Sequence, residues 1–299
     1  MRVFVTGASG HIGLAVVAEL IAAGHAVVGL ARSDGSAARL TTAGASALRG
    51  DLDDLDGLQA AARAADGVIH LAFKHELAFS GHFADAVSAD LRAIQALSAA
   101  LEGSGKPFVG TAGTLLLARE VRGRAGTEAD RAAGGPRVDA ENAVIALAER
   151  GVRTSVIRLA PTVHSSLDHH GFVPSLVAMA RKNGVSAYVG DGANRWPAVH
   201  TLDAARLYRL ALESAPAGSR LHATDDEGVA FREIAEAIGR GLGLPARGVA
   251  ADEAAQYLGF LASFAALDNP TSSARTRELL GWQPTHPKLL ADLAAGHYF

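Results

Sequence analysis

The sequence predicts an α/β fold built on a doubly wound parallel sheet, and three observations carry that prediction. Short runs of apolar residues alternate with longer helix-like runs over the first half of the chain. A glycine-rich turn joins the first of these runs to the first helix, and beyond about residue 165 the alternation loosens into segments punctuated by glycine and proline. Strands that alternate with helices imply crossover connections, so we expect a parallel sheet with helices on both faces.

The expected elements follow one another in a regular order. The predicted strands cover residues 3–6, 26–30, 45–48, 68–71, 108–111 and 154–159. Helices are expected at 12–23, 55–65, 83–102 and 138–150, and later at 172–182, 203–213, 231–242 and 252–265. We therefore predict a first domain over residues 1–164, with contributions to its sheet from about 186–213. A smaller C-terminal part, mainly residues 165–299, is expected to bind the substrate.

The turn after the first strand reads Thr-Gly-Ala-Ser-Gly-His-Ile-Gly, with glycines at positions 7, 10 and 13. At this spacing the first glycine allows the tight turn, and the second lets the backbone approach phosphates. The third lets the helix pack closely on the sheet. The positive end of the following helix then faces an anion. The pattern predicts a Rossmann-type domain that binds the pyrophosphate of a dinucleotide.

Composition argues against several other classes of protein. The chain has 299 residues, 49% of them hydrophobic, which is enough for a sizeable core. Its net charge of -3 and its lack of a dense basic run argue against nucleic acid as a partner. The sequence has no cysteine, which excludes disulfides and thiolate chemistry. Because no apolar run approaches membrane-spanning length and no signal peptide is evident, we expect a cytoplasmic protein with no membrane partner.

Several motifs, in order, resemble the extended short-chain dehydrogenase/reductase superfamily, the epimerase/dehydratase-like group. They are the glycine turn, Asp51-Leu52, His70-Leu71-Ala72, the segment 158–164 (Arg-Leu-Ala-Pro-Thr-Val-His), and the stretches 190–192 and 197–203. The resemblance implies a nicotinamide cofactor, a small-molecule substrate and, as is common among such relatives, a homodimer. The cofactor-binding residues that we expect are Gly7, Ser9, Gly10, His11, Ile12, Gly13, Arg32, Ser33, Asp51, Leu52, Leu71, Ala72, Thr111, Pro161 and Val163.

The end of the second strand favours NADP(H) over NAD(H). Sites selective for NAD commonly place an acidic residue there to bind the ribose hydroxyls, and this chain has Ala31. Arg32 and Ser33 follow, a guanidinium that can grip a 2′-phosphate and a hydroxyl that can assist. A solvated arginine is the alternative interpretation of Arg32. Asp34 lies slightly beyond the usual acidic position, although a loop shift would bring it to the ribose.

The superfamily resemblance also implies a catalytic tyrosine followed by a lysine four residues later, and this pair is missing. The four tyrosines are Tyr188, Tyr208, Tyr257 and Tyr298, and none has lysine four residues on. The matching positions are Arg137 and Glu141. Arg137 could polarise a carbonyl or hold a carboxylate, and Glu141 could act as a base if burial raised its pKa. The alternative is an exposed pair at i and i+4 with no catalytic role.

Further candidates lie where loops follow the strands. Thr111 and Thr114 flank the position at which the superfamily supplies a serine or threonine, and we take Thr114 as the catalytic candidate. On the substrate side we expect Lys74, His75, His164, Phe172 and Trp196. Phe73, Phe172 and Trp196 would form an apolar wall for a hydrophobic substrate, although core packing explains them equally well. Asp168, His169 and His170 lie in the same loop region as His164, but their spacing predicts no metal site.

The favoured hypothesis is an NADP(H)-dependent oxidoreductase of the atypical short-chain dehydrogenase/reductase kind. It would move hydride to or from a small hydrophobic carbonyl, imine or activated alkene, with the cofactor supplying the chemistry. Because the usual dyad is absent, the second hypothesis is a non-catalytic NADP(H)-binding module that senses redox state or regulates a partner.

Overall fold

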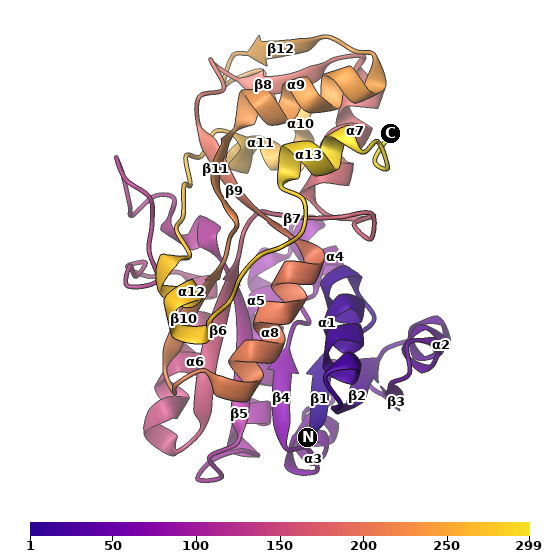
Figure 1. Cartoon of the computed structure of the whole chain (residues 1–299), viewed down its shortest axis with the longest axis vertical. Helices are drawn as coiled ribbons and strands as arrows, with labels where there is room; N and C mark the ends of the chain where they lie inside the picture. The colour runs from indigo at the N-terminus through magenta and orange to yellow at the C-terminus, as the bar shows by residue number, and fades with distance from the viewer.

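The computed structural model describes residues 1–299, including every side chain except those of Phe79 and Pro136. The fold centres on a seven-stranded sheet in the order β10-β6-β5-β4-β1-β2-β3, and every neighbouring pair is parallel. Figure 1 shows this sheet in the lower half of the molecule, with a smaller C-terminal part above the carboxyl ends of its strands. The predicted doubly wound Rossmann-type α/β fold is confirmed.

The strands and helices of the larger part closely follow the predicted ranges. Its strands are β1 (Arg2–Thr6), β2 (Ala26–Ala31), β3 (Ser46–Arg49), β4 (Gly67–His70), β5 (Pro107–Gly113), β6 (Arg153–Leu159) and β10 (Ser219–Ala223). Its helices are α1 (His11–Ala22), α2 (Asp34–Thr42), α3 (Leu55–Arg63), α4 (His75–Phe79), α5 (Phe83–Ala99), α6 (Pro136–Ala146) and α8 (Thr201–Ser214). Short 3-10 turns follow at Thr114–Leu117 and Leu147–Arg150.

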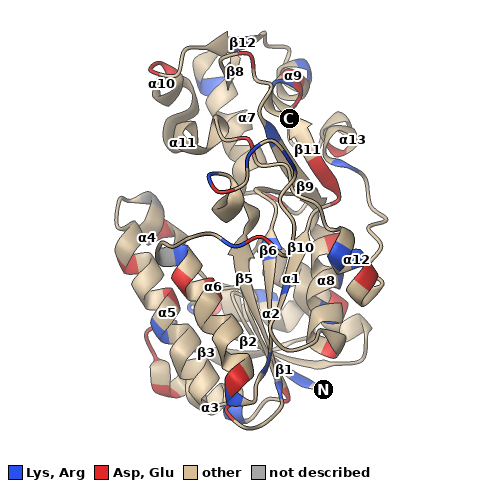
Figure 2. Cartoon of the chain, turned by 90° about the vertical axis from the view of Figure 1, so that its left-hand side faces the viewer, with Lys and Arg blue, Asp and Glu red and all other residues tan. Residues whose placement is uncertain are grey.

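Helices cover both faces of the sheet because the strands are apolar on both sides. One core combines strand residues with α1, α8 and Leu40 of α2, all fully or nearly fully buried. The other combines the opposite strand residues with α3, α5 and α6. A sheet buried on both faces requires runs of apolar residues rather than alternation. Figure 2 marks charged residues along α3, α5 and α6, while buried residues of the same helices, such as Leu58, Ala93 and Val144, belong to this second core.

The C-terminal part has its own core. Its strands are β7 (Thr162–His164), β8 (Ser186–Val189), β9 (Arg195–His200), β11 (Asp226–Ala230) and β12 (Ala246–Val249). They pair as a three-stranded sheet, β11-β9-β7, and a two-stranded sheet, β12-β8. The remaining helices are α7 (Phe172–Asn183), α9 (Phe231–Leu242), α10 (Ala254–Leu258), α11 (Ala262–Ala265), α12 (Ala274–Leu280) and α13 (Leu289–Ala294), with a 3-10 turn at Gly259–Leu261.

Three sequence expectations differ from this arrangement. The strand that completes the central sheet is β10, which lies after the expected range 186–213. That range instead supplies α8, which packs on one face of the sheet, and the strands β8 and β9, which belong to the smaller sheets. Helix α2 was not predicted, although Ser33 caps it by accepting a hydrogen bond from the N–H of Ser36 at 3.2 Å. The helix expected at 252–265 is interrupted at Gly259, whose φ of +50° no helical residue adopts.

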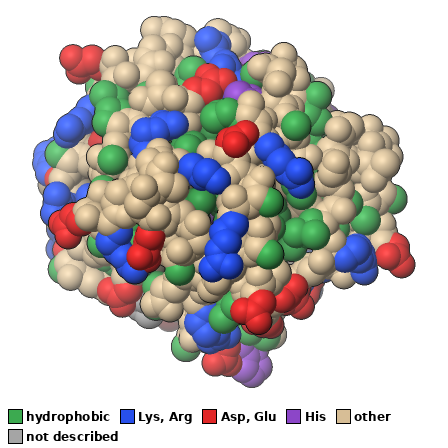
Figure 3. Space-filling view, turned by 90° about the horizontal axis from the view of Figure 1, so that it is seen from below, with side chains coloured by type: hydrophobic (Ala, Val, Ile, Leu, Met, Phe, Trp, Pro, Cys, Tyr) green, Lys and Arg blue, Asp and Glu red, His purple; other side chains and the backbone are tan. Residues whose placement is uncertain are grey.

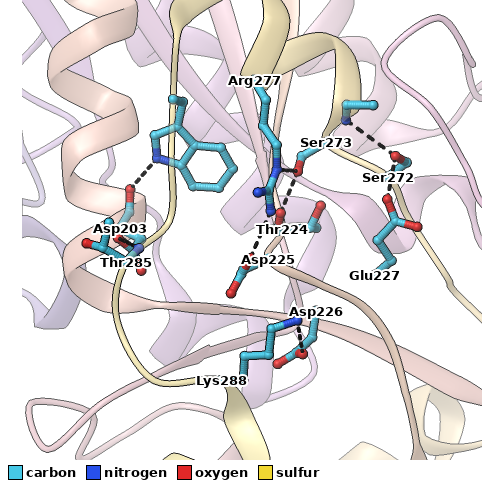
Figure 4. A network of polar contacts seen from close by, with 12 residues as sticks. Asp203, Thr224, Asp225, Asp226, Glu227, Ser272, Ser273, Arg277, Thr285 and Lys288 are labelled. Atoms are coloured by element: carbon cyan, nitrogen blue, oxygen red, sulfur yellow. Dashed lines mark hydrogen bonds and ion pairs between the residues drawn. The ribbon is translucent and has the colours of Figure 1, made fainter.

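A long connection ties the two parts together. The chain leaves the C-terminal part after α11, runs down to α12 beside β10, and returns to α13 (Figure 1). Figure 4 shows how this connection is held: Arg277 donates to Asp225 at 2.8 Å, and Lys288 pairs with Asp226 at 3.4 Å. The Ser273 hydroxyl also donates to the carbonyl of Thr224 at 2.6 Å. These contacts make the C-terminal part and the central sheet depend on each other.

Asp203 is a fully enclosed carboxylate of this junction, more buried than Asp225 and Asp226. Its carboxylate is 1% exposed and accepts three hydrogen bonds, from the N–H groups of Thr285 and His286, both at 3.0 Å, and from the His286 ring at 2.9 Å. Its backbone carbonyl accepts from the Trp282 indole at 2.9 Å. The first turn of α8 and the returning connection are therefore joined through one residue.

On the face made by the amino ends of the strands, basic and acidic side chains are interspersed (Figure 3). This face therefore presents no large patch of a single sign within the part of the chain that the structure describes. None of the described helices combines the length and apolar character needed to cross a membrane.

We expect Asp203→Asn to lower the free energy of unfolding by about 1–3 kcal/mol, because the new amide would turn a donor toward a buried N–H donor. The matched control is Asp191→Asn, since Asp191 also accepts a backbone N–H, from Ala193 at 3.0 Å, but is exposed. That control should change stability by less than about 0.5 kcal/mol. Urea denaturation of both variants measures the difference, and equal effects would contradict the junction role of Asp203.

Candidate functional site

The glycine turn has the geometry that a phosphate needs. Gly7 has φ +67°, and a Cβ there would lie 2.7 Å from the Ala72 nitrogen. A Cβ on Gly13 would lie 2.1 Å from the Gly7 carbonyl oxygen, so α1 packs at a distance that only glycine permits. A Cβ on Gly10 would instead meet only the Gly7 oxygen, at 3.3 Å. The space beside Gly10 is therefore open to a ligand.

The start of α1 offers donors to that space. Gly10 is the N-cap, and no described side chain caps the helix there. The first N–H groups of a helix lack partners within it and carry its positive end. His11, Ile12 and Gly13 form this first turn, beside Ser9. Uncapped donors next to an open glycine are what a pyrophosphate requires.

A cavity of about 260 Å³ continues along the carboxyl ends of β2, β3 and β4. The residues that line it are Arg32, Asp51, Phe73, Lys74, His75, Glu76 and Leu77. The cavity thus brings together two expected cofactor residues, Arg32 and Asp51, and two expected substrate residues, Lys74 and His75. Glu76 lies 3.6 Å from the Arg32 guanidinium, and both side chains are largely exposed. Such an exposed pair is weak and yields easily to a stronger anion.

The other expected cofactor residues surround these two features. Leu71 and Ala72 follow β4, half-buried beside Gly7, and Leu52 is buried after β3. Ser33 caps α2, so its hydroxyl is engaged at the cavity rim. The Thr111 hydroxyl donates to the His70 carbonyl at 2.7 Å and lies 2.8 Å from the Tyr208 hydroxyl. Pro161 and Val163 are half-buried at β7, where the C-terminal part begins.

Arg137 is held at the carboxyl edge of the sheet by a buried carboxylate. Its guanidinium donates to Asp90 of α5 at 2.7 Å and lies over the Phe73 ring, 4.4 Å from the ring centre. The second Asp90 oxygen lies 3.1 Å from Nε2 of His70, and Nδ1 of His70 lies 2.7 Å from the Thr6 hydroxyl. Asp90 is 3% exposed. This chain of contacts fixes the guanidinium relative to β1 and β4.

Glu141 does not pair with Arg137, so the alternative interpretation of an exposed i, i+4 pair is wrong. Glu141 is 5% exposed and accepts two hydrogen bonds from Arg158, at 2.7 and 2.8 Å, and one from Arg220 at 2.6 Å. Burial raises its pKa, but the hydrogen bonds and charges of the two arginines outweigh burial and hold the pKa below the ordinary value. A carboxylate with both oxygens engaged in this way is a poor base. Its role is to neutralise the buried Arg158.

Three further candidates are buried rather than open to a ligand. Thr114 is completely buried and accepts a hydrogen bond from Asn269 at 2.9 Å. His164 is 1% exposed, with its Nδ1 2.8 Å from Asp292. Trp196 is also completely buried, packed edge-on against Phe231. Of the expected apolar wall, Phe73 and Phe172 are partly exposed, whereas β9 turns Trp196 into the C-terminal core.

Sequence reasoning missed the residues that position the site. Asp90 faces the core from the middle of an otherwise apolar helix side, beside Ala86, Ala89 and Ala93. A charged residue at a core-facing position of a helix is rare without a partner. That signal was present in the sequence, but the identity of the partner, Arg137, was not.

His200, Asp203 and His286 place ligand-type atoms within 4.8 Å of one another. The two imidazole rings are stacked, with planes 8° apart and centres 4.7 Å apart. The lone pairs of ring nitrogens lie in the ring plane, so parallel stacked rings cannot both point at one ion. The Asp203 oxygens already accept three hydrogen bonds. The cluster therefore fits hydrogen bonding better than metal coordination.

Comparison with known proteins identifies the family. The model of the NAD dependent epimerase/dehydratase family matches residues 3–110. Uncharacterized protein C2A9.02 of Schizosaccharomyces pombe is 46% identical over 301 residues and covers 100% of both chains. Residues 3–110 form a domain of the NAD dependent epimerase/dehydratase family.

Other comparisons agree with this assignment. The sterol-4-alpha-carboxylate 3-dehydrogenase, decarboxylating, of Dictyostelium discoideum is 29% identical over 248 residues, 78% of this chain and 74% of that relative. The dTDP-glucose 4,6-dehydratase of Streptomyces venezuelae, solved with NAD, has the same fold: the TM-score is 0.80, the identity 20%, and the match covers 99% of this chain and 96% of that one. The family model describes proteins that depend on NAD, and the glycine turn of this chain has a geometry that fits such a dinucleotide.

We expect Gly10→Val to abolish dinucleotide binding while leaving the apo protein folded. Its φ of -80° suits valine, and the added atoms enter only the space reserved for phosphate. Calorimetry with NAD+ and NADP+ gives the affinities, and circular dichroism gives the melting temperature.

The matched comparison is Gly13→Ala. Its Cβ would collide with backbone at 2.1 Å, so this variant should lose stability as well as binding. If Gly10→Val kept its affinity within about a factor of two, the phosphate site would lie elsewhere.

Proposed function

We propose that the chain is an NADP(H)-dependent oxidoreductase that moves hydride to or from a small hydrophobic carbonyl, imine or activated alkene. The observation that carries the proposal is the combination of the open glycine turn with the adjoining cavity, in which Arg32 and Lys74 supply positive charge. The bound dinucleotide would donate or accept the hydride, and the chain binds and orients the two reactants. Family membership favours an enzyme over the non-catalytic redox sensor.

The proposed preference for NADP(H) rests on the residues at the carboxyl end of β2. Ala31 is fully buried and offers no carboxylate to the ribose, whereas Arg32 follows it at the cavity wall. The carboxylate of Glu76 already lies 3.6 Å from the Arg32 guanidinium. A 2′-phosphate would replace that weak contact with a charge-assisted, bidentate one. Asp34 is fully exposed and lies 3.4 Å from Arg49, so it is directed to another cation.

Arg137 takes the place of the absent tyrosine in this proposal, but with a different role. A guanidinium stays protonated, so Arg137 stabilises developing negative charge on a substrate oxygen rather than transferring a proton. Asp90 fixes its direction, and the Phe73 ring shields one face of the guanidinium. A donor that is already oriented costs no reorganisation during the reaction. His70 and Asp90 act as positioning residues.

We expect Arg32→Ala to weaken NADP(H) binding by more than about tenfold and to leave NAD(H) binding nearly unchanged, because one charged phosphate contact contributes roughly 1.5–3 kcal/mol. The control is Arg39→Ala, which removes an exposed arginine from α2, outside the cavity lining. Calorimetric titration with both cofactors gives the ratio of affinities. Equal weakening of the two cofactors would contradict the assignment of Arg32 to the 2′-phosphate.

Arg137→Ala should lower kcat/KM by about tenfold or more while cofactor affinity hardly changes. Asp90→Asn should produce a smaller loss, since it leaves the guanidinium in place but less firmly directed. A screen of aldehydes, ketones, imines and enones, followed by nicotinamide absorbance, identifies the activity to be measured. The control is Arg63→Ala, at an exposed position of α3. If turnover survived Arg137→Ala, another group would hold the substrate oxygen.

A further inference from the structure

A buried carboxylate lies beside the start of α1 without full hydrogen bonding. Asp168, in the loop after β7, is 3% exposed, and among the described residues its Oδ2 has no hydrogen-bond partner. Its Oδ1 accepts the N–H of Gly171 at 2.7 Å and lies 3.5 Å from Nδ1 of His11. His11 is the first residue of α1 and directly follows Gly10. The carboxylate therefore adjoins the expected phosphate site.

The hydrogen bonds around His11 assign its proton. The Thr201 hydroxyl donates its single proton to the carbonyl of His164, at 3.1 Å. Its oxygen must then accept from its other two contacts, the Ser165 hydroxyl at 2.9 Å and Nε2 of His11 at 2.7 Å. A neutral His11 thus carries its proton on Nε2 and turns the lone pair of Nδ1 toward Asp168. One added proton converts this contact between two acceptors into a hydrogen bond.

The surroundings decide where that proton resides. Burial raises the pKa of Asp168 to about 6, against hydrogen bonds from Gly171 and His170 that lower it. Burial, together with the charges of neighbouring histidines, lowers the pKa of His11 to about 4. The titratable groups that face the pair are His164, His169, His170, His200 and Tyr298, whose hydroxyl interacts with the Asp168 carboxylate. Asp292 lies behind His164, at 2.8 Å from its Nδ1. Near neutral pH the carboxyl, rather than the imidazole, is the group that exchanges a proton.

We propose that His11 and Asp168 take up one proton from solvent when a dinucleotide pyrophosphate binds at the start of α1. The proposal rests on the proposed cofactor site. A phosphate anion repels the ionised carboxylate of Asp168 but not the neutral acid, so binding favours the protonated pair. The same proton gives His11 a hydrogen-bonded partner at Nδ1. Cofactor binding and protonation are then reciprocal, and each strengthens the other.

The sign of the pH dependence follows. Below about pH 5.5 the carboxyl already holds its proton, so the cofactor binds without proton uptake and at its tightest. As the pH rises above the pKa of Asp168 in the free protein, cofactor binding must either be accompanied by uptake of a proton or proceed against the repulsion between the phosphate and the ionised carboxylate. A pKa that rises by about one unit on binding corresponds to an approximately tenfold change in affinity. We therefore expect the Kd to rise about tenfold between about pH 5.5 and 8.

The test uses NAD+ as its probe. The 2′-phosphate of NADP+ titrates near pH 6 and would hide the effect, whereas the pyrophosphate of NAD+ stays ionised over this range. Calorimetry at several pH values gives the Kd, and titrations in buffers of different ionisation enthalpy give the protons taken up per NAD+ bound. For the natural sequence, a pKa rise of about one unit corresponds to uptake of at most about half a proton per NAD+ bound, with the maximum between about pH 6 and 7.

Asp168→Asn is the decisive variant, because its amide oxygen keeps the hydrogen bond from Gly171. It should bind NAD+ with a flat pH profile, take up no proton, and at pH 8 approach the affinity of the natural sequence at pH 5.5. The control Asp268→Asn makes the same change at a carboxylate held by Arg195 at 2.8 Å, remote from the turn, and should keep the natural profile.

The outcomes separate the inference from the function on which it rests. Binding of NAD+ by the natural sequence without proton uptake would overturn the inference and leave the cofactor site standing, even if Asp168→Asn failed to fold. Proton uptake that persisted in Asp168→Asn would also overturn it, because one of the facing histidines would then be the acceptor. Failure of NAD+ and NADP+ to bind at any pH would overturn both proposals.

Discussion

The close backbone packing around the glycine turn is the constraint on which the rest of the site depends. A Cβ on Gly7 or Gly13 would collide with backbone at 2.7 or 2.1 Å, so β1, β4 and α1 meet at distances that only glycine permits. This packing directs the start of α1 into open space beside Gly10 and aligns it with the cavity that ends at Arg32. The C-terminal part, held by Asp203 and the returning connection, then covers the same edge.

Three buried carboxylates illustrate two different roles. Some hold other side chains in position, and one can change its protonation state when a ligand binds. Asp90 and Glu141 are each paired with an arginine at 2.7 Å, and this pairing fixes their positions. Asp168 has no cation of this kind; it faces a histidine at 3.5 Å. Burying a charge without a partner is costly, and a proton relieves that cost. The first two therefore maintain geometry, whereas the third can change its charge when an anion arrives.

Much of the fold was accessible from the sequence, and the site less so. The glycine spacing and the strand-helix alternation predicted the central sheet and its first six strands within a few residues. The unpredicted helix α2 was signalled by Ser33, which the NADP(H) hypothesis assigned to phosphate binding instead of capping. The alternative interpretation of Glu141, as an exposed partner of Arg137, rested on the two residues lying on one side of α6. Arg158 and Arg220, from separate strands, bind it more strongly from within the core.

The sequence by itself determined the local features: where strands and helices form, where only glycine fits, and that no tyrosine stands four residues before a lysine. These depend on residues near one another along the chain, whose periodicity and spacing are directly readable. Only the tertiary structure decided which polar side chains meet, because Arg137 and Asp90 are 47 positions apart and His11 and Thr201 are 190 apart. It also decided that His164 and Trp196 are buried. Partner choice and burial depend on how distant elements pack, and no local pattern encodes that packing.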